Sequence, residues 1–272
     1  MAEAAPLPLL GAALQQGRRR SVRAARTKRL ASSLAAIAAL ALLIALGLGH
    51  GGLCSTSSEE TPHPHRGKLK AFKRGLPESI KLGSSEEAVL ASGKPWFSTS
   101  QNGNTGTGKA VVDVEAPPEI VWHQLLDFNA YPEKVPKVST CKIYNHQKKG
   151  GKEHIFVHFV SPVLPGYRFQ YFCDHTYEKS KKSLTWCLDY DRLSDFEDVQ
   201  GHWHVEPHPT KAAWSRVFYE VKLMVPKYLP KMVINVLTTK AIRDATTWVR
   251  FESEKEAARL GPSKKKKNRV SA

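Results

Sequence analysis

The stretch APPEIVWHQLLDFNAYPEKVP, residues 116–136, determines how the C-terminal half of the chain folds. Its two prolines stand at the start of the stretch, where a helix tolerates a missing N–H group. The apolar residues that follow recur at the spacing of one helical face, at Ile120, Val121, Leu125 and Leu126. We therefore expect a helix over residues 116–127 and a short turn or helix over 131–135.

The segments around this helix alternate between apolar and polar residues, which is typical of half-buried strands. The predicted strands cover residues 110–114, 138–146, 153–160, 167–178, 183–191, 199–206 and 212–224. Residues 161–166 contain two prolines and are expected to form a loop. A long helix is expected over residues 230–260, with one apolar face at Val233, Leu237, Ala241, Ala245 and Trp248.

This order of elements predicts an α+β fold. An antiparallel sheet with one apolar face must bury that face, and a long amphipathic C-terminal helix is its natural cover. We expect a curved antiparallel sheet of about six to seven strands wrapped around that helix. A sheet that curves around a helix leaves room for a cavity between the two.

Residues 116–136 and the stretch SDFEDVQGHWHVEP, residues 194–207, resemble the START-like (helix-grip, SRPBCC) superfamily. The first matches a helix that ends in an Asp-x-x-x-Tyr-Pro-x-x-x-Pro-like turn, and the second a Gly-x-Trp strand. The resemblance covers residues 108–258 and is greatest to the coenzyme Q-binding and polyketide cyclase/lipid transport branch. It implies a cavity between sheet and helix that binds a lipid, sterol, quinone or polyketide.

Strand and helix periodicity place several large apolar and aromatic side chains on the inner faces. Each of them, taken alone, is equally explained as part of a solid core, and the resemblance favours a pocket for the set. The candidate ligand-binding residues are Phe169, Tyr171, Trp186, Leu188, Trp203, Val205, Tyr219, Val233, Leu237 and Ala241.

Metal and disulfide sites have weaker support. His202 and His204 leave the same strand face, opposite Trp203, and are expected to point to solvent without a third ligand. A two-residue turn at 180–181 matches the apolar faces of its two strands and sets Cys173 out of register with Cys187, so free thiols are expected. We expect no metal and no cofactor.

The N-terminal region carries a different signal. Residues 30–49, LASSLAAIAALALLIALGLG, form an uncharged stretch of 20 residues. As a helix it would span about 30 Å, the thickness of a bilayer core. A basic cluster over residues 18–29 precedes it and favours a single-pass anchor with a cytoplasmic N-terminus. A cleaved signal or an organelle transit segment, for a chloroplast, mitochondrion or endomembrane, remains an alternative.

The predicted organisation has five parts. They are a basic segment over 1–29, a transmembrane or targeting segment over 30–49, a flexible linker over 50–107, the START-like domain over 108–260 and a basic tail over 261–272. The formal net charge of +16 comes mainly from clusters outside the domain, and no nucleic-acid motif accompanies them, so we expect a membrane partner and no nucleic acid.

No catalytic motif is present: the sequence has no Gly-x-Ser-x-Gly, P-loop, dinucleotide fingerprint or His-Glu-x-x-His. We expect membrane-tethered binding or transport of an apolar ligand, with no assigned catalytic residue. One alternative is a polyketide cyclase or dehydrase that uses the same cavity. Another is an adaptor that binds a lipid surface through the basic tail.

Overall fold

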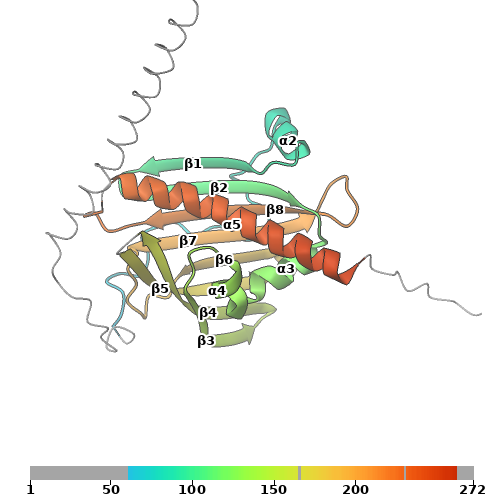
Figure 1. The fold of residues 1–272 in the computed structure, drawn as a ribbon. Helices are drawn as coiled ribbons and strands as arrows, with labels where there is room; N and C mark the ends of the chain where they lie inside the picture. The colour runs from blue at the N-terminus through green and yellow to red at the C-terminus, as the bar shows by residue number, and fades with distance from the viewer. Residues whose placement is uncertain (1–60, 165–166, 230, 262–272) are drawn as a thin grey trace, which may run out of the picture. The chain divides into compact units, whose positions relative to one another are not determined.

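The computed structural model describes residues 61–164, 167–229 and 231–261 (Figure 1). Its strands are β1 Trp96–Asn102, β2 Thr105–Val114, β3 Thr140–Lys149, β4 Lys152–Leu164, β5 Tyr167–Glu178, β6 Ser183–Leu188, β7 Asp198–Pro207 and β8 Ser215–Met224. Its helices are α2 Ser84–Ala91, α3 Pro118–Leu126, α4 Tyr131–Lys134 and α5 Lys231–Leu260, with 3-10 turns η2 Phe128–Ala130 and η3 Lys179–Lys181.

The predicted α+β helix-grip fold is confirmed. All neighbouring strands are antiparallel, in the order β1-β2-β8-β7-β6-β5-β4-β3, and this sheet has eight strands rather than the expected six to seven. Helix α5 crosses one face of the sheet and packs against β1, β2, β8 and α3 (Figure 1). The inner faces of the strands and this helix enclose one continuous apolar core.

The additional strand lies in a region predicted to be linker. Residues 50–107 were expected to be flexible, whereas α2, β1 and the start of β2 fall within this range. Asn102 pairs with Thr105 across a two-residue turn at Gly103–Asn104, and Gly103 has a φ of +57°. Gly and Asn tolerate the positive φ that such hairpin turns need, so the turn residues carried a hairpin signal that the polar composition obscured.

Strand β4 also runs further than the sequence predicts. The expected loop over 161–166 is strand as far as Leu164, and Pro162 pairs with Arg168 of β5. The register shifts between Pro162 and Leu164. Because an irregularity of this kind relieves the missing N–H of proline, the strand continues where an uninterrupted ladder would end.

The register between β5 and β6 is the predicted one. Cys173 pairs with Leu188, and Asp174 pairs with Cys187, so the two sulfur atoms belong to different rungs of the ladder. Cys141, Cys173 and Cys187 are free thiols.

The outer face of the sheet is covered by the strap, which we define as residues 61–82. It passes behind the strands in Figure 1, on the face opposite α5. The ring of Phe72 lies 6.1 Å from the ring of His202, and the hydroxyl of Ser79 donates to the carboxylate of Glu220. His202 is only 1% exposed and His204 only 4%. The expectation that both histidines face solvent is therefore wrong, because the strap shields the face that they occupy.

Asp198 is the main attachment point of the strap. Its buried carboxylate accepts hydrogen bonds from the backbone N–H groups of Lys68 at 2.6 Å and Leu69 at 2.7 Å. It also accepts the hydroxyl of Tyr190 and the N–H of Val199, both at 2.8 Å. The two hydrogen bonds from Lys68 and Leu69 therefore tie the strap to β7 through this side chain.

In the part of the chain that the structure describes, no helix is long and apolar enough to cross a membrane. The predicted segment over 30–49 lies outside the described residues.

We expect Asp198→Ala to release the strap. The change leaves two strap N–H groups and the Tyr190 hydroxyl without their acceptor, at a cost of about 2–4 kcal/mol in the free energy of unfolding. Limited trypsin digestion should then cut the chain faster within residues 68–74, and urea unfolding should show the loss of stability. Glu78→Gln is the control, because Glu78 pairs only with the exposed Lys73 of the same strap. Equal digestion of both variants would contradict this role of Asp198.

Candidate functional site

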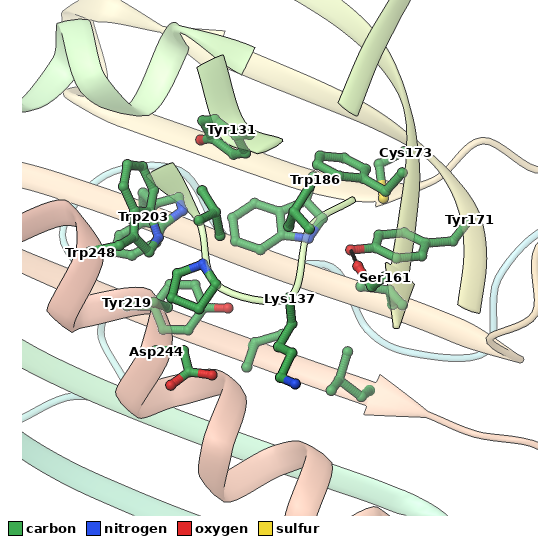
Figure 2. Close-up of a pocket in the computed structure, with 18 of the residues that line it drawn as sticks. Tyr131, Lys137, Ser161, Tyr171, Cys173, Trp186, Trp203, Tyr219, Asp244 and Trp248 are labelled. Carbon is green, nitrogen blue, oxygen red and sulfur yellow. Dashed lines mark hydrogen bonds between the residues drawn. The ribbon is translucent and has the colours of Figure 1, made fainter. Parts of the chain in front are cut away.

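A cavity of about 250 Å³ lies between the concave face of the sheet and α5. Strands β4 to β8, the segment from η2 to Val138 and helix α5 all contribute to its wall. Figure 2 shows the rings of Tyr131, Trp186, Trp203, Tyr219 and Trp248 around it. Most of the wall is therefore aromatic and apolar.

The structure brings together five of the ten predicted ligand-binding residues. The residues that line the cavity are Tyr171, Trp186, Trp203, Tyr219 and Leu237. Phe169, Leu188 and Val205 lie instead in the surrounding core, where Phe169 stacks on Phe196 at 4.8 Å between ring centroids. The side chains of Val233 and Ala241 lie outside the described residues.

The position of Trp186 depends on Gly201. The two residues pair across β6 and β7, and a Cβ atom at Gly201 would overlap the indole of Trp186. The indole therefore lies over the backbone of β7 and stacks toward Tyr219, with 6.0 Å between ring centroids. A glycine at this one position gives the wall a wide flat ring where a side chain would otherwise fill the space.

Several lining residues are absent from the predicted set. Tyr131 follows α3, and its ring lies 5.2 Å from that of Trp248 on α5. Its hydroxyl donates to the carbonyl of Leu125 at 2.7 Å, which fixes the ring against the end of α3. The Tyr-Pro motif marked a turn in the sequence, but only the tertiary fold shows that the turn faces the cavity.

His175 is the most unusual polar group of the wall. It is 5% exposed, and its Nδ1 has no hydrogen-bond partner. Phe128 and Trp186 flank the ring, at 4.8 Å and 5.7 Å between centroids. Burial lowers its pKa to about 3, with partial compensation from the backbone of Ile155 and Cys173. The imidazole is therefore neutral at physiological pH.

The other polar groups inside the cavity are neutral as well. The hydroxyls of Ser161 and Tyr171 lie 3.4 Å apart. Burial raises the pKa of Tyr171 and of Tyr219 above the usual range, and it raises the pKa of the Cys173 thiol in the same way. A thiol held protonated is a poor nucleophile. The interior thus offers hydrogen bonds to a ligand without placing a charge beside it.

The opening of the cavity is marked by the lining residues that are exposed. These are Pro136, Lys137 and Lys240, with Asp244 half-buried beside them on α5. Lys137 has a φ of +66°, in the left-handed region. A residue with a Cβ atom adopts this conformation at a cost of about 1–2 kcal/mol.

The structure contains no metal centre within residues 61–164, 167–229 and 231–261, where no three potential ligands of the His, Cys, Asp and Glu types gather. His202 instead has protein partners at both nitrogens. Its Nε2 lies 3.0 Å from the hydroxyl of Ser183, and its Nδ1 lies 3.5 Å from the carboxylate of Glu220.

The enclosed cavity between a curved antiparallel sheet and its C-terminal helix defines a START-like domain. Residues 114–247 match the family described as "Polyketide cyclase / dehydrase and lipid transport". This match supports the expected resemblance to the polyketide cyclase and lipid transport branch. It does not support the expected resemblance to coenzyme Q-binding proteins. No curated protein matches the chain in sequence.

Solved structures of similar fold include the Zhui aromatase/cyclase from Streptomyces sp. R1128, with 16% identity and a TM-score of 0.48 over 58% of this chain and 99% of that one. A START superfamily protein from Mycobacterium smegmatis has 14% identity and a TM-score of 0.45 over 57% and 99%. A STAR-related lipid transfer protein from Xanthomonas axonopodis has 16% identity and a TM-score of 0.44 over 58% and 98%.

The neutral state of His175 predicts a pH dependence of stability. Its folded pKa of about 3 lies below the ordinary value of 6.5, so the unfolded chain takes up the proton first as the pH falls. The contribution of His175 is fully present above pH 6.5 and is lost as the pH falls toward about 3. The slope is at most about 1.4 kcal/mol per pH unit.

We expect urea unfolding of His175→Gln to show a flatter pH profile than the unsubstituted protein between pH 6.5 and 5. His123→Gln serves as the control, because His123 lies exposed on α3. Parallel profiles for the protein and its His175→Gln variant would show that His175 does not contribute in this way.

Proposed function

We propose that this domain binds and carries an apolar ligand in its cavity. The observation that carries the proposal is the cavity of about 250 Å³, whose wall is largely aromatic and whose interior polar groups are held neutral. An engineered cavity of about 150 Å³ holds one benzene. The larger space here suits one or two fused rings or a short alkyl chain. Tyrosine and tryptophan add apolar area together with a hydrogen-bonding group, which suits an amphipathic ligand.

Binding is better supported than catalysis. A general acid or base works best when its pKa lies near the operating pH, and the pKa of His175 is about 3. Cys173 is protonated, so neither side chain is prepared for covalent or proton-transfer chemistry. A cyclase or dehydrase in the same cavity would have to take its acid or base from the charged residues at the opening, Lys137, Lys240 and Asp244.

Membrane tethering is the second part of the proposal. Residues 30–49 contain no charge, and the basic cluster over 18–29 precedes them. This combination is typical of an anchor that keeps its basic flank in the cytoplasm. A single-pass anchor would keep the cavity close to the bilayer, where apolar ligands reside. The organelle to which this membrane belongs is left open by the sequence.

The ligand-binding proposal predicts that filling the cavity weakens binding. Ala245 lines the cavity on α5, so Ala245→Phe places a ring in the ligand space. We expect this variant to bind the neutral dye N-phenyl-1-naphthylamine at least about tenfold more weakly, a loss of about 1.4 kcal/mol. Energy transfer from the tryptophans to the dye measures binding to the full chain, with all variants in the same detergent.

The matched control is Thr247→Phe, which adds the same ring two residues away on the exposed side of α5. This variant should bind the dye as the unsubstituted chain does. Equal weakening by both substitutions, or no energy transfer in the unsubstituted chain, would overturn the ligand-binding proposal.

The tethering proposal predicts that two charges within residues 30–49 release the chain from membranes. We expect Leu42→Arg with Leu43→Arg to move the protein from the carbonate-resistant pellet to the supernatant, since each arginine costs about 2.5–3.5 kcal/mol at the centre of a spanning helix. Leu9→Arg with Leu10→Arg, outside the segment, should remain in the pellet. A mature chain whose intact mass lacks residues 1–50 would identify a cleaved targeting segment instead.

A further inference from the structure

The turn at the opening of the cavity contains a lysine where glycine is the usual residue. The N–H of Val138 donates to the carbonyl of Val135 at 3.2 Å and closes a four-residue turn. Pro136 is its second residue, and Lys137 is its third with a φ of +66°. A proline followed by a residue of positive φ is the type II pattern, in which glycine or asparagine avoids the steric cost. Nothing in the turn itself requires a lysine.

The side chain of Lys137 lies at the cavity opening. Figure 2 shows it extending from the turn in front of the cavity, with Asp244 on the neighbouring helix. Lys240, one helical turn before Asp244, also lines the cavity. The exposed ends of both lysines are therefore available to a molecule that enters between the turn and α5.

Neither lysine is neutralised by a salt bridge among the described residues. Lys134, by contrast, has partners for its charge. Its Nζ lies 2.8 Å from Asp127 and 2.9 Å from Gln124. Asp244 is the one carboxylate that lines the cavity, so the charged groups of its wall are two lysines and one aspartate. Because the interior groups are neutral, the opening has a net positive charge.

We propose that the ligand carries an anionic group, a carboxylate or a similar monoanion, which Lys137 and Lys240 bind at the opening while its apolar part enters the cavity. The inference rests on the proposed ligand-binding function and specifies its ligand class. Strain that is retained at one position of a binding site is a reason to look for a function of that residue. Here the function is to hold a positive charge beside an otherwise neutral cavity.

The test compares two ligands of nearly equal size and shape, 2-naphthoate and 2-naphthamide. Both are measured by displacement of N-phenyl-1-naphthylamine from the full chain. We expect the unsubstituted chain to bind naphthoate about two- to fivefold more tightly than naphthamide, which is the range for a partly exposed charge pair. This preference should diminish as the salt concentration rises, because salt screens exposed charges.

Lys137→Gly separates the ligand contact from a structural role. Glycine suits the left-handed position, so the melting temperature of the variant should not fall, whereas its preference for naphthoate should decrease by about twofold. Lys240→Gln should lower the preference in the same direction. Lys142→Gln is the control, because Lys142 is exposed on β3 next to the buried Cys141 and does not line the cavity.

Each contrary outcome identifies what fails. If the neutral dye binds but naphthoate is not preferred, the anionic ligand is excluded and the ligand-binding function stands. A loss of melting temperature together with equal loss of both ligands in Lys137→Gly would make Lys137 structural and overturn the inference. An equal effect of Lys142→Gln would assign the preference to the general basic charge of the chain. Absence of dye binding would overturn the proposed function itself.

Discussion

The arrangement of α5 on the sheet is the constraint from which the cavity follows. The helix packs on β1, β2 and β8 and on α3, which is only part of the concave face. The helix approaches β2 closely at Gly108, where a Cβ atom would overlap Ile242. On the other part of the sheet, η2 and α4 lie against β3. The cavity lies between these two contacts, and the aromatic rings line it.

Periodicity was sufficient to predict the architecture, because each of the strands and helices that build it presents an apolar face to the core. The stripe of α3, the alternation of β5 to β8 and the register across Ser180–Lys181 all follow from matching apolar faces. Local composition misled the prediction where tertiary contacts compensate for polar residues. Strand β1 is polar and mostly exposed, and the strap combines hydrogen bonds to Asp198 with a small apolar contact at Ile80.

The cavity residues were predictable only as members of a face. Alternation identified Tyr171, Trp186 and Tyr219, but it could not separate them from Leu188 or Val205, which lie on equivalent inner faces in the solid core. Tyr131 comes from the four-residue helix α4 and Lys137 from a turn, and both segments are too short for periodicity to indicate direction. The neutrality of His175 depends on burial by neighbours distant in sequence, which is established only when the chain is folded.

The open ends of the sheet affect how the protein behaves in a crowded solution. The sheet does not close on itself, so β1 and β3 are edge strands with free backbone groups that another strand could pair with. Strand β3 carries Lys142, Lys148 and Lys149, and its register with β4 shifts between Ile143 and Asn145. Charges and an irregular ladder are unfavourable for pairing with a second sheet. The same features that make β3 a poor template for aggregation allow it to remain exposed beside the cavity turn.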